Sequence, residues 1–92
     1  MLFMIIERFA NNDMAPVYRR VRERGRQLPD GLRYVDSWVE PTLARCFQLM
    51  ECEDIALVHE WTKLWDGCGV TFEEIVPVIP SAEARELVES RL

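Results

Sequence analysis

Apolar and polar positions along the chain form a regular succession of strand-like and helix-like segments. Alternating or continuous apolar runs predict strands, and apolar residues three or four positions apart predict helices. The predicted strands cover about residues 2–9, 32–40, the segment after the turn Glu40-Pro41-Thr42-Leu43, and 70–79. The predicted helices run from Asn11-Asn12-Asp13 to about Leu28, from about Asp54 to Gly67, and from Ser81 to about Arg91. This order, βαββαβ with an extra C-terminal helix, predicts an α+β ferredoxin-like fold with an antiparallel sheet.

The first and third predicted strands carry large apolar side chains on both of their faces. Helices on one side of a single sheet cover only one of these faces. A chain of 92 residues also buries only about 60 to 65% of the surface that it exposes when unfolded. We therefore expect a homodimer, in which each subunit is one domain over residues 1–92 and residues 80–92 form a helical appendage.

The hairpin turn decides which side chains share a face of the predicted sheet. A two-residue loop at Pro41 and Thr42 pairs Glu40 with Leu43. This register puts the following pairs on one face: Trp38 with Arg45, Asp36 with Phe47, and Tyr34 with Leu49. The other face collects smaller and mostly apolar pairs: Val39 with Ala44, Ser37 with Cys46, Val35 with Gln48, and Arg33 with Met50. The first face is aromatic with embedded charge, and it predicts a cation–π pair of Trp38 with Arg45.

Charge excludes some classes of partner. Sixteen Asp and Glu against eleven Lys and Arg give a net charge of -5, which repels polyphosphates and anionic lipid surfaces. We therefore expect neither nucleic acid nor a membrane as a partner. Five arginines between Arg19 and Arg26 would suit an anion-binding patch, but they alternate with apolar residues such as Val21. That alternation favours the solvated face of an amphipathic helix.

The cysteines and the N-terminus indicate where the protein resides. Cys46, Cys52 and Cys68 are odd in number and follow no metal-binding spacing, which disfavours disulfides and structural zinc and fits a reducing cytoplasm. We expect Cys46 to be a buried structural residue and not a reactive thiol. The apolar run Met1 to Ile6 follows no basic region and ends at Glu7-Arg8, so it predicts a buried strand and not a signal or membrane segment.

Three segments resemble a known family of uncharacterised bacterial proteins. These segments are Tyr34 to Glu40, Arg45 to Cys52, and Phe72 to Val78, and the resemblance extends from Met1 to about Ala84. The family is grouped with the dimeric α/β barrel superfamily. The resemblance implies a protomer whose sheet packs against that of a twin subunit. The superfamily includes cofactor-free monooxygenases, haem-degrading enzymes, lactone isomerases and proteins without known catalysis, so it does not imply one reaction.

His59 is the only histidine and the first candidate metal ligand. The segment His59-Glu60-Trp61-Thr62-Lys63 begins like a zinc-protease motif, but Lys63 replaces its second histidine and excludes that site. The haem-degrading relatives bind haem through a histidine on the second helix. However, helical spacing puts His59 near the polar side, and Ile5 and Ile6 stand where those relatives have an asparagine. We therefore expect a surface histidine, no metal site and no cofactor.

Carboxylates and aromatic residues supply the other candidates. Five carboxylates lie within or at the ends of predicted strands: Glu7, Asp36, Glu51, Glu73 and Glu74. One interpretation is a partly buried acid or base with a raised pKa beside Tyr34 and Trp38. The favoured interpretation is ion pairing with nearby arginines or exposure to solvent. Trp61 and Trp65 share one helical stripe, which is typical of a core but also suits the wall of an aromatic ligand pocket.

Two functions of different classes agree with these observations. The first is a dimeric barrel that binds a small apolar or aromatic ligand, with these candidate binding residues: Trp38, Arg45, Trp61 and Trp65. The second is a cofactor-independent monooxygenase or isomerase, with these candidate catalytic residues: Tyr34, Asp36 and Glu51. The enzyme hypothesis requires a carboxylate and an aromatic hydroxyl to converge in an open pocket.

Overall fold

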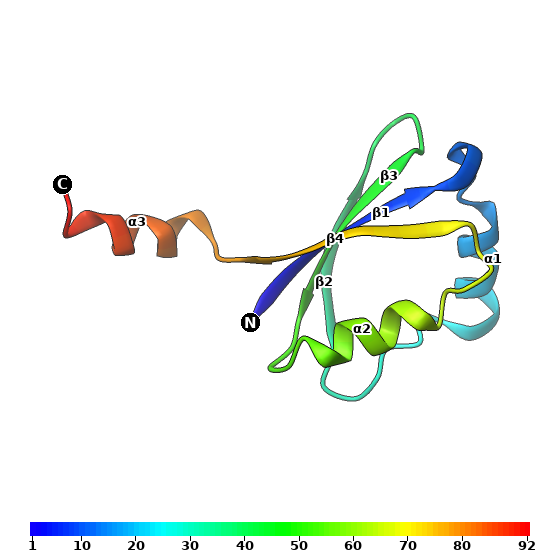
Figure 1. Cartoon of the computed structure of the whole chain (residues 1–92), viewed down its shortest axis with the longest axis horizontal. Coiled ribbons are helices and arrows are strands. Elements are labelled where there is room, and N and C mark those ends of the chain that lie inside the picture. The colour runs from blue at the N-terminus through cyan, green and yellow to red at the C-terminus, as the bar shows by residue number, and fades with distance from the viewer.

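The computed structural model describes residues 1–92, which form a four-stranded antiparallel sheet and three α-helices (Figure 1). The strands are β1 (Leu2–Phe9), β2 (Arg33–Val39), β3 (Arg45–Glu51) and β4 (Val70–Val78), in the spatial order β2-β3-β1-β4. The helices are α1 (Ala15–Arg24), α2 (Ala56–Lys63) and α3 (Ser81–Glu89). The predicted α+β ferredoxin-like fold is confirmed. None of the helices combines the length and the apolar composition needed to cross a bilayer.

Helix α1 ends earlier than the sequence pattern predicts. The helix stops at Arg24 and not near Leu28, because Gly25 adopts a φ of 69° while its N–H still bonds to the Val21 carbonyl at 2.7 Å. Leu28 nevertheless packs against the core from the loop, which explains why the apolar spacing continued past the helix. At the other end, the Asp13 carboxylate accepts a hydrogen bond from the Ala15 N–H at 3.0 Å, as expected of a residue that starts a helix.

The register of the β2–β3 hairpin differs from the prediction by two residues. The predicted turn forms, with the Leu43 N–H bonded to the Glu40 carbonyl at 2.8 Å. However, Leu43 has a φ of 64°, and the Glu40 N–H bonds to the carbonyl of Arg45 instead of pairing with Leu43. Trp38 consequently lies opposite Phe47 and not opposite Arg45. A shift of two residues leaves each side chain on its predicted face, since side chains alternate with a period of two.

A bulge in β2 overturns the predicted position of Tyr34. Tyr34 pairs with Met50 and Asp36 pairs with Leu49, so Val35 is an extra residue in the strand. The bulge puts Tyr34 on the same face as Ser37, to which its hydroxyl is hydrogen bonded at 2.7 Å. The predicted cation–π pair of Trp38 with Arg45 is also wrong. The Arg45 guanidinium instead bonds to Glu40 at 2.8 Å and lies 5.1 Å from the centre of the Phe47 ring.

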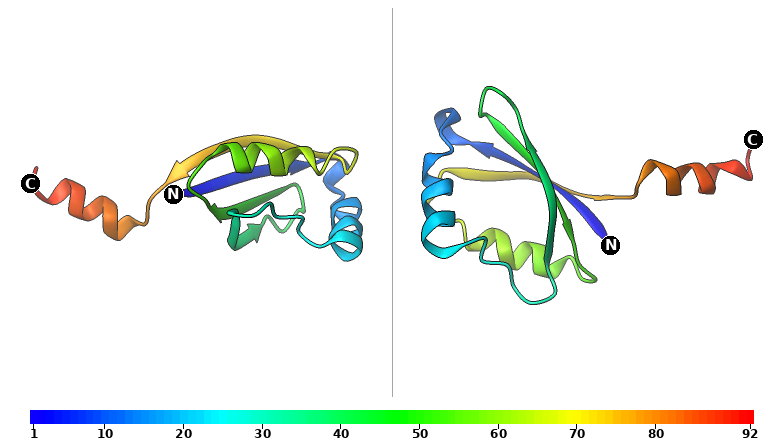
Figure 2. Two further views of the ribbon diagram at one scale, coloured as in Figure 1. Left: turned by 90° about the horizontal axis from the view of Figure 1, so that it is seen from below. Right: turned by 180° about the vertical axis from the view of Figure 1, so that it is seen from behind.

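The core lies between one face of the sheet and helices α1 and α2 (Figure 2). Its largest fully buried side chains are Phe3, Ile5, Met50 and Val58. Trp61 of α2 and Trp65, which lies two residues beyond the end of this helix, meet edge to face with ring centres 5.9 Å apart. The Trp61 indole N–H donates to the Arg26 carbonyl at 2.9 Å. Both tryptophans are therefore core residues, and helices α1 and α2 pack over the inner face of the sheet.

No helix covers the opposite face of the sheet. We call this the open face; its apolar side chains come from all four strands: Leu2, Met4, Ile6, Trp38, Phe47, Leu49, Val76 and Val78. Trp38 is 52% exposed there. Helix α3 does not cover the open face either, because it stands clear of the rest of the chain beyond the end of β4 (Figure 1).

Candidate functional site

A cavity of about 100 Å³ lies between the inner face of the sheet and helices α1 and α2. Strands β1 and β3 contribute Glu7, Phe9, Cys46 and Gln48, and β4 contributes Val70 and Phe72. Helices α1 and α2 contribute Val17, Tyr18, Val21 and Trp61, and the turn after α2 contributes Trp65. Most of the lining is apolar, so the few polar side chains decide what the cavity can bind.

Glu7 is the most unusual residue of this cavity. The alternation of β1 turns it inward between Ile5 and Phe9, and it is only 5% exposed. Its Oε1 atom is buried without a hydrogen-bond partner. Burial raises the pKa of Glu7 to about 7, although the positive charge of Arg26 lowers it in part. Near neutral pH the cavity therefore contains a carboxyl group that is partly protonated and free to bond to a ligand.

Two residues of β3 flank Glu7. Cys46 lies directly opposite Glu7 in the register, and burial together with the nearby Glu7 raises the pKa of its thiol to about 12. Cys46 is therefore buried and protonated, as expected for a structural cysteine. The Gln48 side-chain amide makes one hydrogen bond, a weak one from Nε2 to the Met50 sulfur at 3.4 Å. Gln48 thus retains hydrogen-bonding capacity beside the cavity.

The cavity opens towards solvent between α1 and β2. Three of its lining residues are exposed there: Tyr18, Arg26 and Val39. The Arg26 guanidinium stacks on the Tyr34 ring at 3.6 Å from its centre, and Tyr34 in turn bonds to Ser37, another lining residue. This chain of contacts holds a positive charge at the entrance, while the interior carries the acidic group.

The predicted site residues fall into two separate groups. Trp61 and Trp65 line the cavity, and Tyr34 supports its entrance through Arg26 and Ser37. Asp36, Trp38, Arg45 and Glu51 all lie on the open face, on the other side of the sheet. Within one chain, the Tyr34 hydroxyl therefore does not converge with the carboxylates of Asp36 and Glu51.

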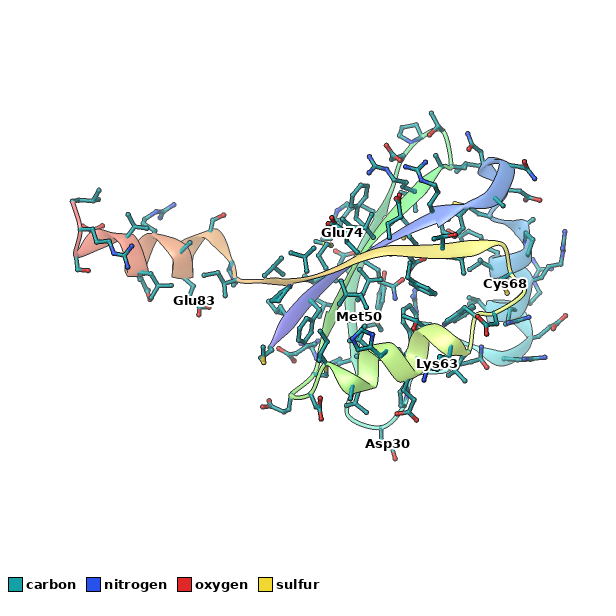
Figure 3. All side chains as sticks on the ribbon, in the orientation of Figure 1. Asp30, Met50, Lys63, Cys68, Glu74 and Glu83 are labelled. Carbon is teal, nitrogen blue, oxygen red and sulfur yellow. The ribbon has the colours of Figure 1, made fainter.

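The strand carboxylates differ sharply in their surroundings. Glu51 bonds to Arg33 at 2.8 Å, which lowers its pKa, and Glu73 bonds to Arg8 at 3.1 Å. Glu74 is exposed on the opposite side of the sheet from Met50 (Figure 3). Only Glu7 combines burial with a raised pKa. The sequence did not separate Glu7 from the other four, because β1 carries apolar side chains on both of its faces and its alternation alone does not show which face is buried.

His59 is exposed on α2, as expected. The structure contains no group of three histidine, cysteine, aspartate or glutamate side chains that could hold a metal ion.

Two of the five arginines between Arg19 and Arg26 make contacts that connect segments of the fold. Arg20 donates to the carbonyls of Leu64 and Asp66 just beyond α2, at 3.1 and 2.8 Å, and Arg26 stacks on Tyr34. Arg19, Arg22 and Arg24 remain on the solvated side of α1.

The fold and the cavity define a small α+β protein of ferredoxin-like architecture with one buried carboxyl group among apolar side chains. The chain belongs to the family described as Domain of unknown function (DUF3303), whose family model matches residues 1–92. No curated protein and no solved structure matches the chain. The function must therefore be argued from the site itself.

Proposed function

We propose that the protein binds a small, largely apolar or aromatic molecule in the cavity beside Glu7. The observation that carries this proposal is the unpartnered Glu7 Oε1 atom in an apolar cavity. A buried polar atom without a partner costs about 1 to 3 kcal/mol, which a ligand with a matching polar group would recover. The indole N–H of Trp65, another lining residue, is also buried without a partner.

The size of the cavity limits the ligand. An engineered apolar cavity of roughly 150 Å³ in another protein binds benzene. The cavity beside Glu7, at about 100 Å³, suits a molecule with a single ring or a short branched chain that extends towards the entrance. Trp61, Trp65 and Phe72 provide aromatic surface for such a molecule, and Glu7 provides one hydrogen bond.

Phenol and toluene are suitable probes because they differ in one hydroxyl group. We expect both to shift the indole N–H signals of Trp61 and Trp65 in NMR titrations. The Glu7→Leu variant should bind phenol about tenfold more weakly, because the hydroxyl loses its partner, and should bind toluene at least as well. Glu74→Gln, on the opposite face, is the matched control and should leave both affinities unchanged. Failure of both probes to perturb either tryptophan would contradict the proposal.

A proton-transfer enzyme is the second candidate, favoured by one observation. The pKa of Glu7, about 7, suits a general acid or base that works at neutral pH. In a cofactor-independent monooxygenase or isomerase, Glu7 would take a proton from a bound substrate, a role first predicted for Asp36 or Glu51. Exchange of the α-carbon proton of a bound ketone for deuterium in D₂O, lost in Glu7→Gln, would distinguish catalysis from binding alone.

The open face supports a homodimer of the dimeric α/β barrel type. Packing of two open faces would bury the apolar side chains of both sheets, as in the superfamily that the chain resembles. Trp38 and Arg45 would then lie at the subunit interface, together with Asp36 and Glu51. In this arrangement the four residues contribute to assembly, and the cavity of each subunit lies on the other side of its sheet.

A further inference from the structure

The C-terminal arm, residues 79–92, does not pack on its own chain. Helix α3 stands apart from the sheet in all the views (Figures 2 and 3), and only Glu83 of its first turn lines an open groove with Leu2 and Val78 of the sheet. The arm leaves four large apolar side chains exposed: Ile79 by 48%, Leu87 by 64%, Val88 by 46% and Leu92 by 92%. Such a helix is unusual in a folded domain because it buries nothing.

Helix α3 is amphipathic, a pattern that is typical of helices packed against another surface. Ala84, Leu87 and Val88 recur at helical spacing and form one apolar stripe, while Glu83, Glu86 and Glu89 lie off it. The helix has nine residues and no side-chain cap at its N-terminus. Isolated helices of this length are marginal in water. The amphipathic pattern therefore predicts a packing partner for the apolar stripe.

The dimensions of the chain agree with a missing partner. Its radius of gyration is 15.0 Å, whereas a compact domain of this length has about 12 Å. It exposes 6305 Å², whereas a compact monomer of this mass exposes roughly 5,500 Å². The excess of roughly 800 Å² equals the area that each partner contributes to a typical stable interface.

We propose that the arm docks on a second copy of this chain, with each subunit's arm packed at the margin of the other subunit's open face. This inference rests on the homodimer proposed above. A second copy is favoured because one chain presents both unpartnered surfaces, and a two-fold axis brings each to the other. The surfaces are continuous, since Val76 and Val78 of the open face lead directly into Ile79.

The short connection between β4 and α3 supports docking of the arm on the other subunit. Only Ile79 and Pro80 separate β4 from α3, and Pro80 holds an extended conformation with φ -59° and ψ 147°. The ring of proline restricts φ, so a link this short gives α3 little freedom to turn back on its own sheet. A helix directed away from its own subunit reaches a neighbour instead.

The experiment compares the full-length protein with Leu87→Asp/Val88→Asp, which places charge in the apolar stripe, and with Glu83→Gln/Glu86→Gln as the control. Sedimentation equilibrium should show a wild-type dimer and a dissociation constant raised at least tenfold in the Asp variant only. Hydrogen exchange should show protected α3 amides in the wild-type dimer and unprotected ones on dilution or in the Asp variant.

Three outcomes would contradict the inference, and sedimentation and hydrogen exchange together distinguish them. A wild-type protein that is monomeric at all concentrations would overturn the homodimer and the docked arm together. A stable dimer whose dissociation constant is unchanged by the Asp variant, with unprotected α3 amides, would overturn the docked arm alone. Protection of α3 that does not change on dilution would show that the arm packs on its own chain, which also overturns the inference.

Discussion

Glu7 is a carboxyl group that the fold keeps away from water and from hydrogen-bond partners. Burial disfavours its charged form, so the pKa rises from 4.5 to about 7. The folded state therefore binds a proton more tightly than the unfolded state does. The stability contributed by this proton is fully present below about pH 4.5 and is lost as the pH rises towards 7.

Glu7→Gln should remove this pH dependence, because its amide has the same shape and cannot ionise. A rise in pKa from 4.5 to about 7 corresponds to about 3 kcal/mol. At pH 8.5 we expect the free energy of unfolding of Glu7→Gln to exceed that of the wild type by about 3 kcal/mol. At pH 4.5 the two should agree within about 1 kcal/mol. Urea unfolding measures both values, and parallel pH profiles for the two proteins would refute a buried, titrating Glu7.

The face of the sheet on which Tyr34 lies was predicted wrongly from the sequence. Strict alternation along β2 places Tyr34 with Asp36 and Trp38. The bulge at Val35 reverses this and brings Tyr34 to Ser37 and Arg26. A bulge depends on how the partner strand is aligned, so no local pattern in β2 could have located it.

Among the elements, α1 shows how one residue can end a helix that the apolar pattern would continue. Gly25 has φ 69° and ψ -163°, angles that are strained for any residue with an L side chain. The turn that follows brings the Arg26 carbonyl to Trp61 and the Arg26 guanidinium to Tyr34. The end of α1 thereby shapes the entrance of the cavity.

Gly25→Ala should destabilise the protein by about 1 to 2 kcal/mol, which lowers Tm by about 5 to 10 °C. A Cβ atom at this position meets nothing within 4 Å, so the cost arises from the backbone alone. A synthetic chain with D-alanine at position 25 is the matched control, because these angles are favourable for the mirror-image residue. Calorimetry measures Tm, and equal losses for both alanines would show that contacts, not backbone strain, matter there.

The whole molecule has two apolar surfaces that no part of the same subunit covers. The open face carries apolar side chains from all four strands, and the arm carries a second apolar surface beside it. Contiguous apolar patches of this kind mark interaction sites. The proposed assembly covers both.

Trp38→Glu should separate the subunits, since it puts a charge in place of an exposed aromatic side chain of the open face, within the proposed interface. We expect native mass spectrometry to show a dimer for the wild type and mainly monomer for the variant at micromolar concentration. Tyr18→Glu, an exposed aromatic residue on α1 away from the open face, should remain dimeric. A monomeric wild type, or equal dimer fractions in the two variants, would exclude the open face as the interface.

The sequence by itself determined the elements and their order, because hydrophobic period, proline, glycine and capping residues act over a few neighbouring positions. β1 was predicted to the residue, and the ferredoxin-like fold followed from the order of elements. Only the tertiary structure decided the hairpin register, the side of the sheet that Tyr34 occupies, and the burial of Glu7 beside a cavity. These features depend on contacts between residues far apart in the chain, such as Glu7 with Cys46 and Tyr34 with Met50. A local pattern shows which face of a strand is apolar, but only packing decides what covers that face and where space is left.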